Sequence, residues 1–268
     1  MRPPKNSITS AGFGGSILGV ALGCLLFFAG NMLAEDYSFS NSLAQAAVAE
    51  KRGDLPTAIK LFAEAEQHES TNAASLCVLA RRYCDLTYAT NSTAAHKELV
   101  GRALACALQA VKVDSNNATA HACVAVCYAK SCADADIKTR LAYSRLFKLE
   151  AEKTIALDPT QDVAYYLLGR WHYGVANMGL VSWAFVKVVY GGMPKASNAE
   201  AIANFKKAIA LAPNRIMHHA GLAMVYDATG ETKLEIAELQ KCRVLKPTGP
   251  EDEDAQRDAE KKLAELRP

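Results

Sequence analysis

The sequence has little of what an enzyme active site usually requires. Its 268 residues contain no G-x-S-x-G, no H-E-x-x-H and no phosphate-binding glycine loop. The pair Gly191-Gly192 follows an apolar run, but no Lys-Ser or Lys-Thr comes after it. These absences exclude the common serine-hydrolase, zinc-protease and P-loop sites, and we expect a protein that is not an enzyme and holds no cofactor.

The sequence also has no strong excess of charge of one sign. Lys and Arg number 30 and Asp and Glu number 28, which leaves a net charge of +2. No block of basic residues is interleaved with aromatic ones, so the electrostatic pattern of a nucleic-acid-binding surface is missing. We expect no nucleic-acid partner.

The eight cysteines include no C-x-x-C pair. Because most of them sit inside helical patterns, they are predicted to be small buried core residues; these are Cys77, Cys84, Cys106, Cys123, Cys127 and Cys132. The nearest approach to a metal site is His121 with Cys123 and Cys127. On one helix His121 and Cys123 point to different faces, so we expect no metal site.

What the sequence does contain is a repeat. Pro213 and Pro247 lie 34 residues apart, and each ends a helical pattern. A period of 34 with two helices per unit is the tetratricopeptide signature. With Ile216 as position 1 of a unit, Leu222, Ala223 and Tyr226 occupy the large, small and aromatic positions 7, 8 and 11. Small residues let the two helices approach closely, and stacking of neighbouring units buries the apolar faces.

The same register extends along most of the chain. Hairpins are predicted over 37–67, over 73–86 with 94–113, from Asn117 to Pro159 with a long second helix from Ile137, and from Asp162 to Pro213. The last of these holds a surplus of 20 residues, an insertion at 174–197 between its two helices. A charged helix over 251–266 matches the cap that such stacks need. We therefore expect an all-α, tetratricopeptide-like right-handed α-solenoid of about five hairpins over 37–268.

The N-terminus predicts a membrane anchor. Residues 1–10 carry Arg2 and Lys5, and the 24 residues from Ala11 to Ala34 carry no charge, which is long enough for a transmembrane helix. A cleavable signal peptide is the alternative, but a clean small-x-small cleavage site is missing. The charge rule would place the body in a lumen, whereas N-terminally anchored mitochondrial outer-membrane proteins expose theirs to the cytosol. We expect a cytosolic body, with the mitochondrial outer membrane favoured and the endoplasmic reticulum second.

A repeat solenoid binds partners through its concave face, which is lined by the first helix of each unit. In register, the predicted groove residues are Arg81, Lys130, Tyr166, Arg170, Tyr173, Met217, Met224 and Asp227. An alternative is that Arg81 and Arg170 simply form ion pairs with Asp85 and Asp227 across the helices.

The insertion is apolar, with Lys187 the one charge before Lys195. We expect it to fold over the groove and join the core. Left in water it would instead mark a membrane or protein contact, made by Trp183, Phe185 and Tyr190.

These residues carry a family resemblance. The run Leu167-Leu-Gly-Arg-Trp-His-Tyr173, the insertion with Leu180-Val-Ser-Trp183, and the helix Ala201 to Ala208 resemble the regulator of microtubule dynamics family. The segments Leu79 to Asp85 and Ala120 to Cys127 resemble its earlier helices, so that the resemblance covers Glu50 to Leu266. This chain departs from the anchored members in lacking a long acidic linker and in having Ala184-Phe-Val186 where they carry charge.

The resemblance implies two functions. The first is a membrane-anchored, non-enzymatic adaptor that binds a protein partner, including tubulin or microtubules, at microtubules or organelle contacts. The second is a phospholipid-binding or transfer domain at a contact between mitochondrion and endoplasmic reticulum. In that second function the Arg170 guanidinium would hold the phosphate headgroup and the insertion would roof an acyl-chain channel.

Overall fold

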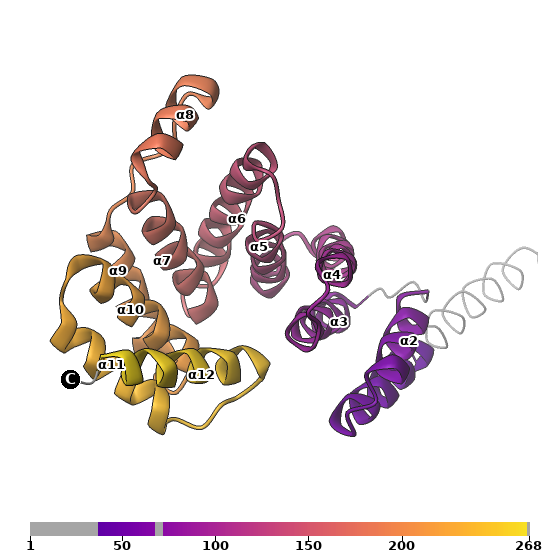
Figure 1. The fold of residues 1–268 in the computed structure, drawn as a ribbon. Helices are drawn as coiled ribbons and strands as arrows, with labels where there is room; N and C mark the ends of the chain where they lie inside the picture. Colours follow the sequence, from indigo (N-terminus) through magenta and orange to yellow (C-terminus); the bar gives the residue numbers. More distant parts are fainter. Residues whose placement is uncertain (1–36, 68–71, 267–268) are drawn as a thin grey trace, which may run out of the picture. The chain divides into compact units, whose positions relative to one another are not determined.

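The computed structural model describes residues 37–67 and 72–266, and all regular secondary structure in these ranges is helical (Figure 1). The basic segment 1–10 and the expected anchor at 11–34 lie outside the described residues. Within the described ranges, no helix combines the length and the apolar character that crossing a bilayer requires.

The chain divides into two compact units, residues 1–71 and 72–268. In the first, residues 37–51 are helical and α2 spans Leu55–Glu66. The turn between them contains Gly53 at φ 75°, and the Asp54 carboxylate caps α2 by accepting from the backbone N–H of Thr57 at 3.2 Å. Pro56 lies in the first turn of α2, where a missing N–H does no harm.

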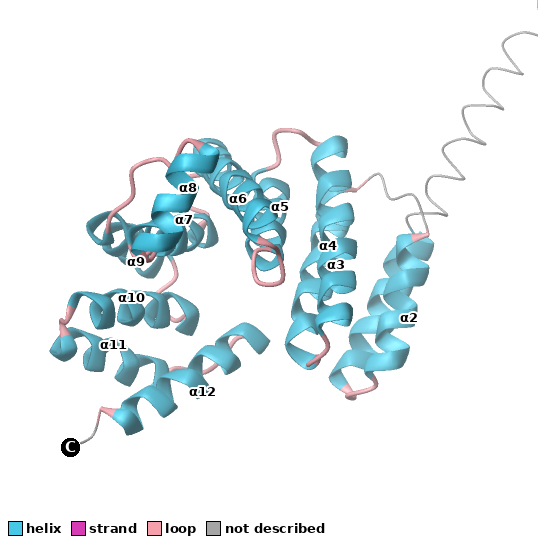
Figure 2. Cartoon of the chain, turned by 45° about the horizontal axis from the view of Figure 1, so that its top comes forward, coloured by secondary structure: helices cyan, strands magenta, loops and turns pink. Residues whose placement is uncertain are grey.

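The second unit is a series of helix pairs (Figure 2). Its elements are α3 (Ala73–Leu86), η1 (Thr87–Ala89), α4 (Thr93–Val113), α5 (Ala118–Ser131), α6 (Ile137–Leu157), α7 (Asp162–Ala176), α8 (Leu180–Tyr190), α9 (Asn198–Leu211), α10 (Ile216–Thr229), α11 (Thr232–Val244) and α12 (Pro250–Glu265). The helices α3 and α4, α5 and α6, α7 and α9, and α10 and α11 pack as pairs. The first helices also contact one another in sequence, α3 with α5, α5 with α7, and α7 with α10.

Local sequence explains where several of these helices begin. Asn72, Ser92, Asn117, Asp136 and Ser197 are N-caps whose side chains accept hydrogen bonds from backbone N–H groups of the first turn. Those N–H groups have no partner within the helix, so each cap satisfies donors that the helix itself cannot.

The core follows the small and large pattern of the repeat. Phe205 of α9 is fully buried, between α7 and α10, and Ala201 and Ala208 on the same helix are buried with it. Trp171 and Leu168 of α7 belong to the same cluster. The neighbouring pairs thus share one continuous core, as stacking of repeats requires.

The insertion differs from expectation. Its helix α8 projects away from the helix pairs (Figure 1), and Leu180 and Val181 are each 86% exposed. Val186 is buried, but Val188 is 84% exposed. The expectation that the insertion folds over the groove and becomes core is therefore wrong. The charge-poor insertion sequence could be read equally as core or as contact surface, because apolar composition alone does not say what covers a helix.

The C-terminal helix α12 packs on α10 and α11. Ala259 and Leu263 are buried there against Ile216 and Cys242, and Ala255 and Leu266 pack against the same cluster. The apolar side expected of a capping helix is the side that faces the stack.

Candidate functional site

The first helices of the second unit line a groove, by which we mean three cavities of about 370, 460 and 250 Å³ that share lining residues. Tyr88 of η1 and Glu251 of α12 line all three, and Tyr166 and Arg170 of α7 line the two larger ones. The cavities therefore adjoin along α3, α5, α7 and α10. Each of the two larger volumes lies within the range of pockets that hold small ligands or peptide side chains.

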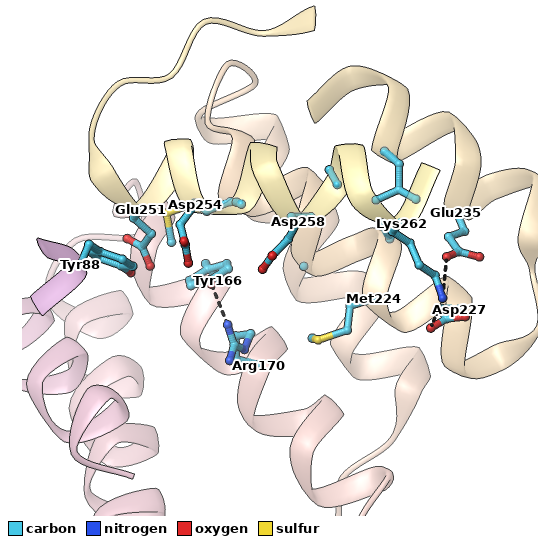
Figure 3. Close-up of a pocket in the computed structure, with 17 residues that line it drawn as sticks. Tyr88, Tyr166, Arg170, Met224, Asp227, Glu235, Glu251, Asp254, Asp258 and Lys262 are labelled. Atoms are coloured by element: carbon cyan, nitrogen blue, oxygen red, sulfur yellow. Dashed lines mark hydrogen bonds and ion pairs between the residues drawn. The ribbon is translucent and has the colours of Figure 1, made fainter. Parts of the chain in front are cut away.

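Arg170 lies at the middle of the groove. One Nη1 N–H donates to the hydroxyl oxygen of Tyr166 at 3.0 Å (Figure 3). The neighbouring Tyr166, and beyond it the carboxylate of Glu251, raise the pKa of the guanidinium above its ordinary value although burial works against this. Arg170 therefore remains charged, and its planar fork presents five donors in total.

Lys130 and Tyr88 form a second cationic position. The Nζ of Lys130 lies 3.9 Å from the centroid of the Tyr88 ring and donates to Thr87 Oγ1 at 3.3 Å. Burial, together with the nearby Glu251 carboxylate, raises the pKa of the Tyr88 hydroxyl. Tyr88 thus stays a neutral phenol that contributes an aromatic face and a hydrogen-bonding tip to the groove.

The smallest cavity holds Arg81 beside a partly buried ion cluster of Asp162, Arg215 and His218. Asp162 Oδ2 accepts from Arg215 Nη1 at 2.9 Å and lies 2.7 Å from Nε2 of His218. Burial works to raise the pKa of Asp162, but the hydrogen bond with His218 and the charge of Arg215 outweigh it and hold that pKa below its ordinary value. Arg215 and Asp162 therefore form a fixed wall beside Arg81.

The acidic face of α12 lies opposite these cations. Glu251, Asp254 and Asp258 line the cavity that contains Arg170 (Figure 3). The helix is held in place because Asp252 accepts from the backbone N–H of Met217 at 3.0 Å and from Thr248 Oγ1 at 2.6 Å. The spacing of apolar and acidic residues along α12 already gives the helix an apolar side and an acidic side. This sequence pattern could have assigned the acidic residues to the groove.

The predicted groove residues are mostly brought together. Arg81, Lys130, Tyr166, Arg170, Met217, Met224 and Asp227 all line at least one of the three cavities. Tyr173 instead packs against the core cluster of α7 and α9. Asp227 pairs with Lys262 at 3.2 Å and Asp85 with Arg82 at 3.7 Å, while Arg170 donates to Tyr166.

Sequence reasoning missed several groove residues. Tyr88 belongs to the short turn η1 between the helices of a pair, where the repeat register assigns no groove position. Glu251, Asp254 and Asp258 belong to the charged capping helix, to which the repeat register assigns no groove position. In the insertion, Trp183 and Phe185 are 48% and 43% exposed and line none of the three cavities, so they do not roof the groove.

Two buried histidines share one arrangement that the sequence did not reveal. His121 Nδ1 contacts the Glu150 carboxylate and Nε2 lies 3.0 Å from the Ser115 carbonyl oxygen. His219 likewise contacts Glu238 at 2.7 Å and the Pro213 carbonyl at 2.9 Å. Both occupy position 4 of a unit, and both join a first helix to its own second helix. His121 thus pairs with a carboxylate, and the described residues contain no group of three or more potential metal ligands.

Comparison with known proteins adds a family to this fold. The family model described as regulator of microtubule dynamics protein 1-3 matches residues 41–267. Regulator of microtubule dynamics protein 3 of Xenopus laevis is 33% identical over 135 residues, which is 50% of this chain and 29% of that protein. Regulator of microtubule dynamics protein 1 of Bos taurus is 30% identical over 147 residues, 54% of this chain and 46% of that protein. Both matches span less than half of the relative's own length.

Among solved structures, a thermophilic tetratricopeptide-repeat protein of Thermus thermophilus matches with a TM-score of 0.59 at 18% identity. The match covers 84% of this chain and 99% of that one. At this identity the likeness concerns the fold, which is the tetratricopeptide-like stack of helix pairs.

Proposed function

This chain belongs to the regulator of microtubule dynamics protein 1-3 family, and on that premise we propose that it is a non-enzymatic repeat adaptor whose groove binds an acidic segment of a protein partner. The relatives' names point to microtubules as the setting. The concave groove is the surface that repeat proteins of this type offer to extended partners.

One observation carries the proposal: the acidic face of α12 already lies opposite the groove's cations. Arg170, Lys130 and Arg81 come from three successive first helices, and Glu251 and Asp254 approach them from α12. A carboxylate-bearing segment is thus complementary in charge to Arg170, Lys130 and Arg81. Tyr88 and Tyr166 add aromatic surface, on which a peptide can pack with little loss of side-chain entropy.

Co-sedimentation with polymerised tubulin tests this proposal. We expect Arg170→Glu to weaken binding by about tenfold or more, since it removes a charged hydrogen-bond donor set and adds repulsion. Arg243→Glu is the matched control, because Arg243 is exposed on α11 and lines none of the three cavities. Polyglutamate should compete with the polymer, and an uncharged polymer of similar length should not. Binding that is insensitive to both Arg170→Glu and polyglutamate would remove the groove from the interaction.

A phospholipid is the second candidate occupant, favoured by the wall of the 460 Å³ cavity. Val126, Val163, Leu167 and Met217 make that wall apolar, and Arg170 lies at its margin. An acyl chain would gain about 0.8 kcal/mol per buried CH₂ there, and the arginine fork would select a phosphate headgroup. Lipid extraction from liposomes containing phosphatidic acid, reduced about tenfold by Arg170→Ala, would favour this occupant over a peptide.

We place the body in the cytosol, attached by residues 11–34 to a membrane, with the mitochondrial outer membrane preferred over the endoplasmic reticulum. In that arrangement the exposed helix α8 contacts a lipid surface. Leu180, Val181 and Val188 are largely exposed, and the only charges from 174 to 197 are those of Lys187 and Lys195. An apolar patch with a tryptophan and two cations but no acid suits an anionic bilayer.

A further inference from the structure

A buried carboxylate without a hydrogen bond lies at one end of the 370 Å³ cavity. Glu235 of α11 lines that cavity and is 2% exposed. Its Oε1 atom makes no hydrogen bond within the part of the chain that the structure describes. Burial, followed by the charge of Asp227, raises the pKa of the Glu235 carboxyl group. Because buried polar groups are ordinarily hydrogen-bonded, this carboxylate lacks a donor that a ligand can supply.

Lys262 of α12 is the cation that approaches Glu235. Its Nζ donates to Oδ2 of Asp227, on α10, at 3.2 Å but stays 3.7 Å from Oε1 of Glu235 (Figure 3). The ammonium group therefore satisfies one carboxylate and only approaches the other. The side chains of Lys262 and Asp227 are both partly exposed, so a ligand can reach this pair of carboxylates from solvent.

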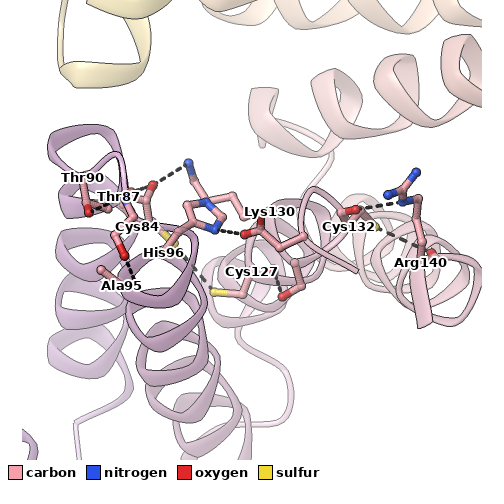
Figure 4. A network of polar contacts seen from close by, with 12 residues as sticks. Cys84, Thr87, Thr90, Ala95, His96, Cys127, Lys130, Cys132 and Arg140 are labelled. Carbon is pink, nitrogen blue, oxygen red and sulfur yellow. Dashed lines mark hydrogen bonds and ion pairs between the residues drawn. The ribbon is translucent and has the colours of Figure 1, made fainter. Parts of the chain in front are cut away.

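The rest of the cavity carries an excess of negative charge. Five carboxylates line it, whereas its cations are Arg170 and Lys262. Arg170 donates to the hydroxyl group of Tyr166. The neighbouring groove cation Lys130 donates to the hydroxyl group of Thr87 (Figure 4). Within the described residues, these two cations thus bond to hydroxyl groups and not to the five carboxylates, and the cavity attracts a further cation.

Helix dipoles do not account for all of these acids. Asp227 lies in the last turn of α10, where the dipole disfavours a negative charge. Asp258 lies more than two turns into α12, beyond the first turn in which an acid is stabilised by the dipole. Stability of the individual helices therefore gives no reason for carboxylates at these two positions, whereas a cationic ligand in the cavity does.

We propose that Asp227 and Glu235 receive an arginine side chain of the protein partner, which takes the place of Lys262. The guanidinium group presents five N–H donors in a planar fork, so it can donate to both carboxylates where the Lys262 ammonium reaches one. The aliphatic stem of the arginine would pack on Met224 and Ala220, which line the same cavity.

The inference rests on the proposed function in that the occupant is a protein segment. It adds a second feature to that segment: acidic residues for Arg170, and an arginine at a fixed distance from them for Asp227 and Glu235. In Figure 3, Met224 lies between Arg170 and this pair of carboxylates. A partner with acidic residues alone would leave the Glu235 carboxylate without a donor.

Fluorescence anisotropy of labelled peptides tests the proposal with the full chain in a neutral detergent. The probe peptides carry three glutamates, a spacer of one to five glycines and an arginine amide, which covers separations up to about 20 Å. Matched peptides carry citrulline, which has the shape of arginine without its charge. We expect the arginine peptide to bind about tenfold more tightly at the best spacer length. Equal affinities at every spacer length would overturn the proposal.

Lys262→Met separates a receiving site from a structural ion pair. Methionine keeps the apolar stem and removes the competing charge, so the arginine peptide should bind about threefold or more tightly. Glu235→Gln should reduce the preference for arginine over citrulline to within about threefold. The matched control is Glu260→Gln, since Glu260 is exposed on α12 and lines none of the three cavities. Weaker binding of the arginine peptide by Lys262→Met would reduce the three groups to a structural ion pair.

The proposed function and this inference fail in different ways. Replacing the three glutamates by glutamine should weaken binding, and an unchanged affinity would contradict the acidic segment while the preference for arginine over citrulline stands. Loss of that preference with the glutamate dependence intact would overturn this inference alone. Millimolar calcium that abolishes the preference in the unmodified chain would assign the carboxylates to a metal ion instead.

Discussion

The ring of Phe205 lies against the backbone of Gly221: a Cβ atom on that glycine would stand 2.4 Å from Cε1 of the ring. On the other side, a Cβ on Gly169 would stand 2.9 Å from the same atom. One aromatic side chain of α9 is thus clasped between glycines of α7 and α10. This close approach fixes the spacing of two successive repeats beside Arg170.

We predict that Gly221→Ala destabilises the repeat domain by about 1–3 kcal/mol, because the added methyl group overpacks a filled core. The matched control is Gly101→Ala on α4, where a Cβ would meet nothing within 4 Å. There the substitution should stabilise by about 0.5–1 kcal/mol, the ordinary helix preference of alanine over glycine. Urea unfolding followed by circular dichroism measures both changes in stability. An unchanged free energy of unfolding in Gly221→Ala would contradict the close packing of Phe205 on Gly221.

Asp252→Ala should destabilise the domain by about 1–3 kcal/mol, since Met217 N–H and Thr248 N–H would lose a buried acceptor. The helix α10 has no capping side chain of its own at Arg215, so Asp252 supplies that cap from α12. Asp258→Ala on the exposed side of α12 serves as control and should change stability by less than about 0.5 kcal/mol. Equal effects of the two substitutions would argue against the capping role.

Stability should fall as the pH drops below about 6.5, an ordinary histidine pKa. Burial lowers the pKa of His218, although the hydrogen bond with Asp162 opposes this. The unfolded chain then binds a proton at His218 at a pH where the folded chain does not, which favours unfolding by up to about 1.4 kcal/mol per pH unit. The pKa of Asp162 is also lowered in the folded chain, so a further loss of stability follows below pH 3.8, the ordinary pKa of its carboxyl group.

Urea titrations at pH 5.5 and 7.5 measure this dependence. The variant His218→Gln should lose less stability over that interval than the unmodified chain. Some dependence should remain, because burial lowers the pKa of His172 as well. An unchanged dependence in His218→Gln would assign the effect to other groups.

Trp183→Ser should reduce flotation of the protein with liposomes that contain phosphatidylserine. The tryptophan is half exposed on α8 and would sit at the headgroup level of a bound bilayer. We expect Lys187→Glu to reduce flotation further on anionic vesicles while having little effect on neutral ones. Because residues 11–34 would mask the effect, the comparison uses residues 37–268. Flotation that is insensitive to both substitutions would leave α8 as a protein contact.

The sequence holds two glycosylation motifs, Asn91-Ser-Thr93 and Asn117-Ala-Thr119, and a cytosolic body predicts that neither is used. Asn91 is exposed before α4, so a luminal transferase could reach it, whereas Asn117 caps α5 by accepting from Ala120 N–H at 3.0 Å. Treatment of the cellular protein with a glycosidase should therefore leave its mass unchanged. A mass shift that Asn91→Gln abolishes would place the body in a lumen.

The sequence alone was sufficient for the family and for the class of fold. The spacing of Pro213 and Pro247 and the small residues at Ala208 and Ala223 follow from the geometry of a stacked helix pair, which repeats along the chain and so leaves a periodic record. The same register placed Arg170 and Lys130 in the groove, because residues at equivalent positions of successive first helices face the same side.

Contacts between residues at non-equivalent positions of the repeats could be determined only from the tertiary structure. Glu251 and Arg170 line the same cavity because of the direction in which α12 returns across the stack. The repeat period does not encode that direction, since the capping helix lies outside the repeat. The exposure of α8 was equally undetermined, since an apolar helix has the same sequence whether a neighbour covers it or not. The contact of the Cys123 thiol with the Cys77 carbonyl oxygen joins residues 46 positions apart, and the packing of Phe205 on Gly221 joins residues 16 positions apart. Such contacts arise only when helices of different repeats pack, because the free energy that selects them comes from burial across the interface and not from the local chain.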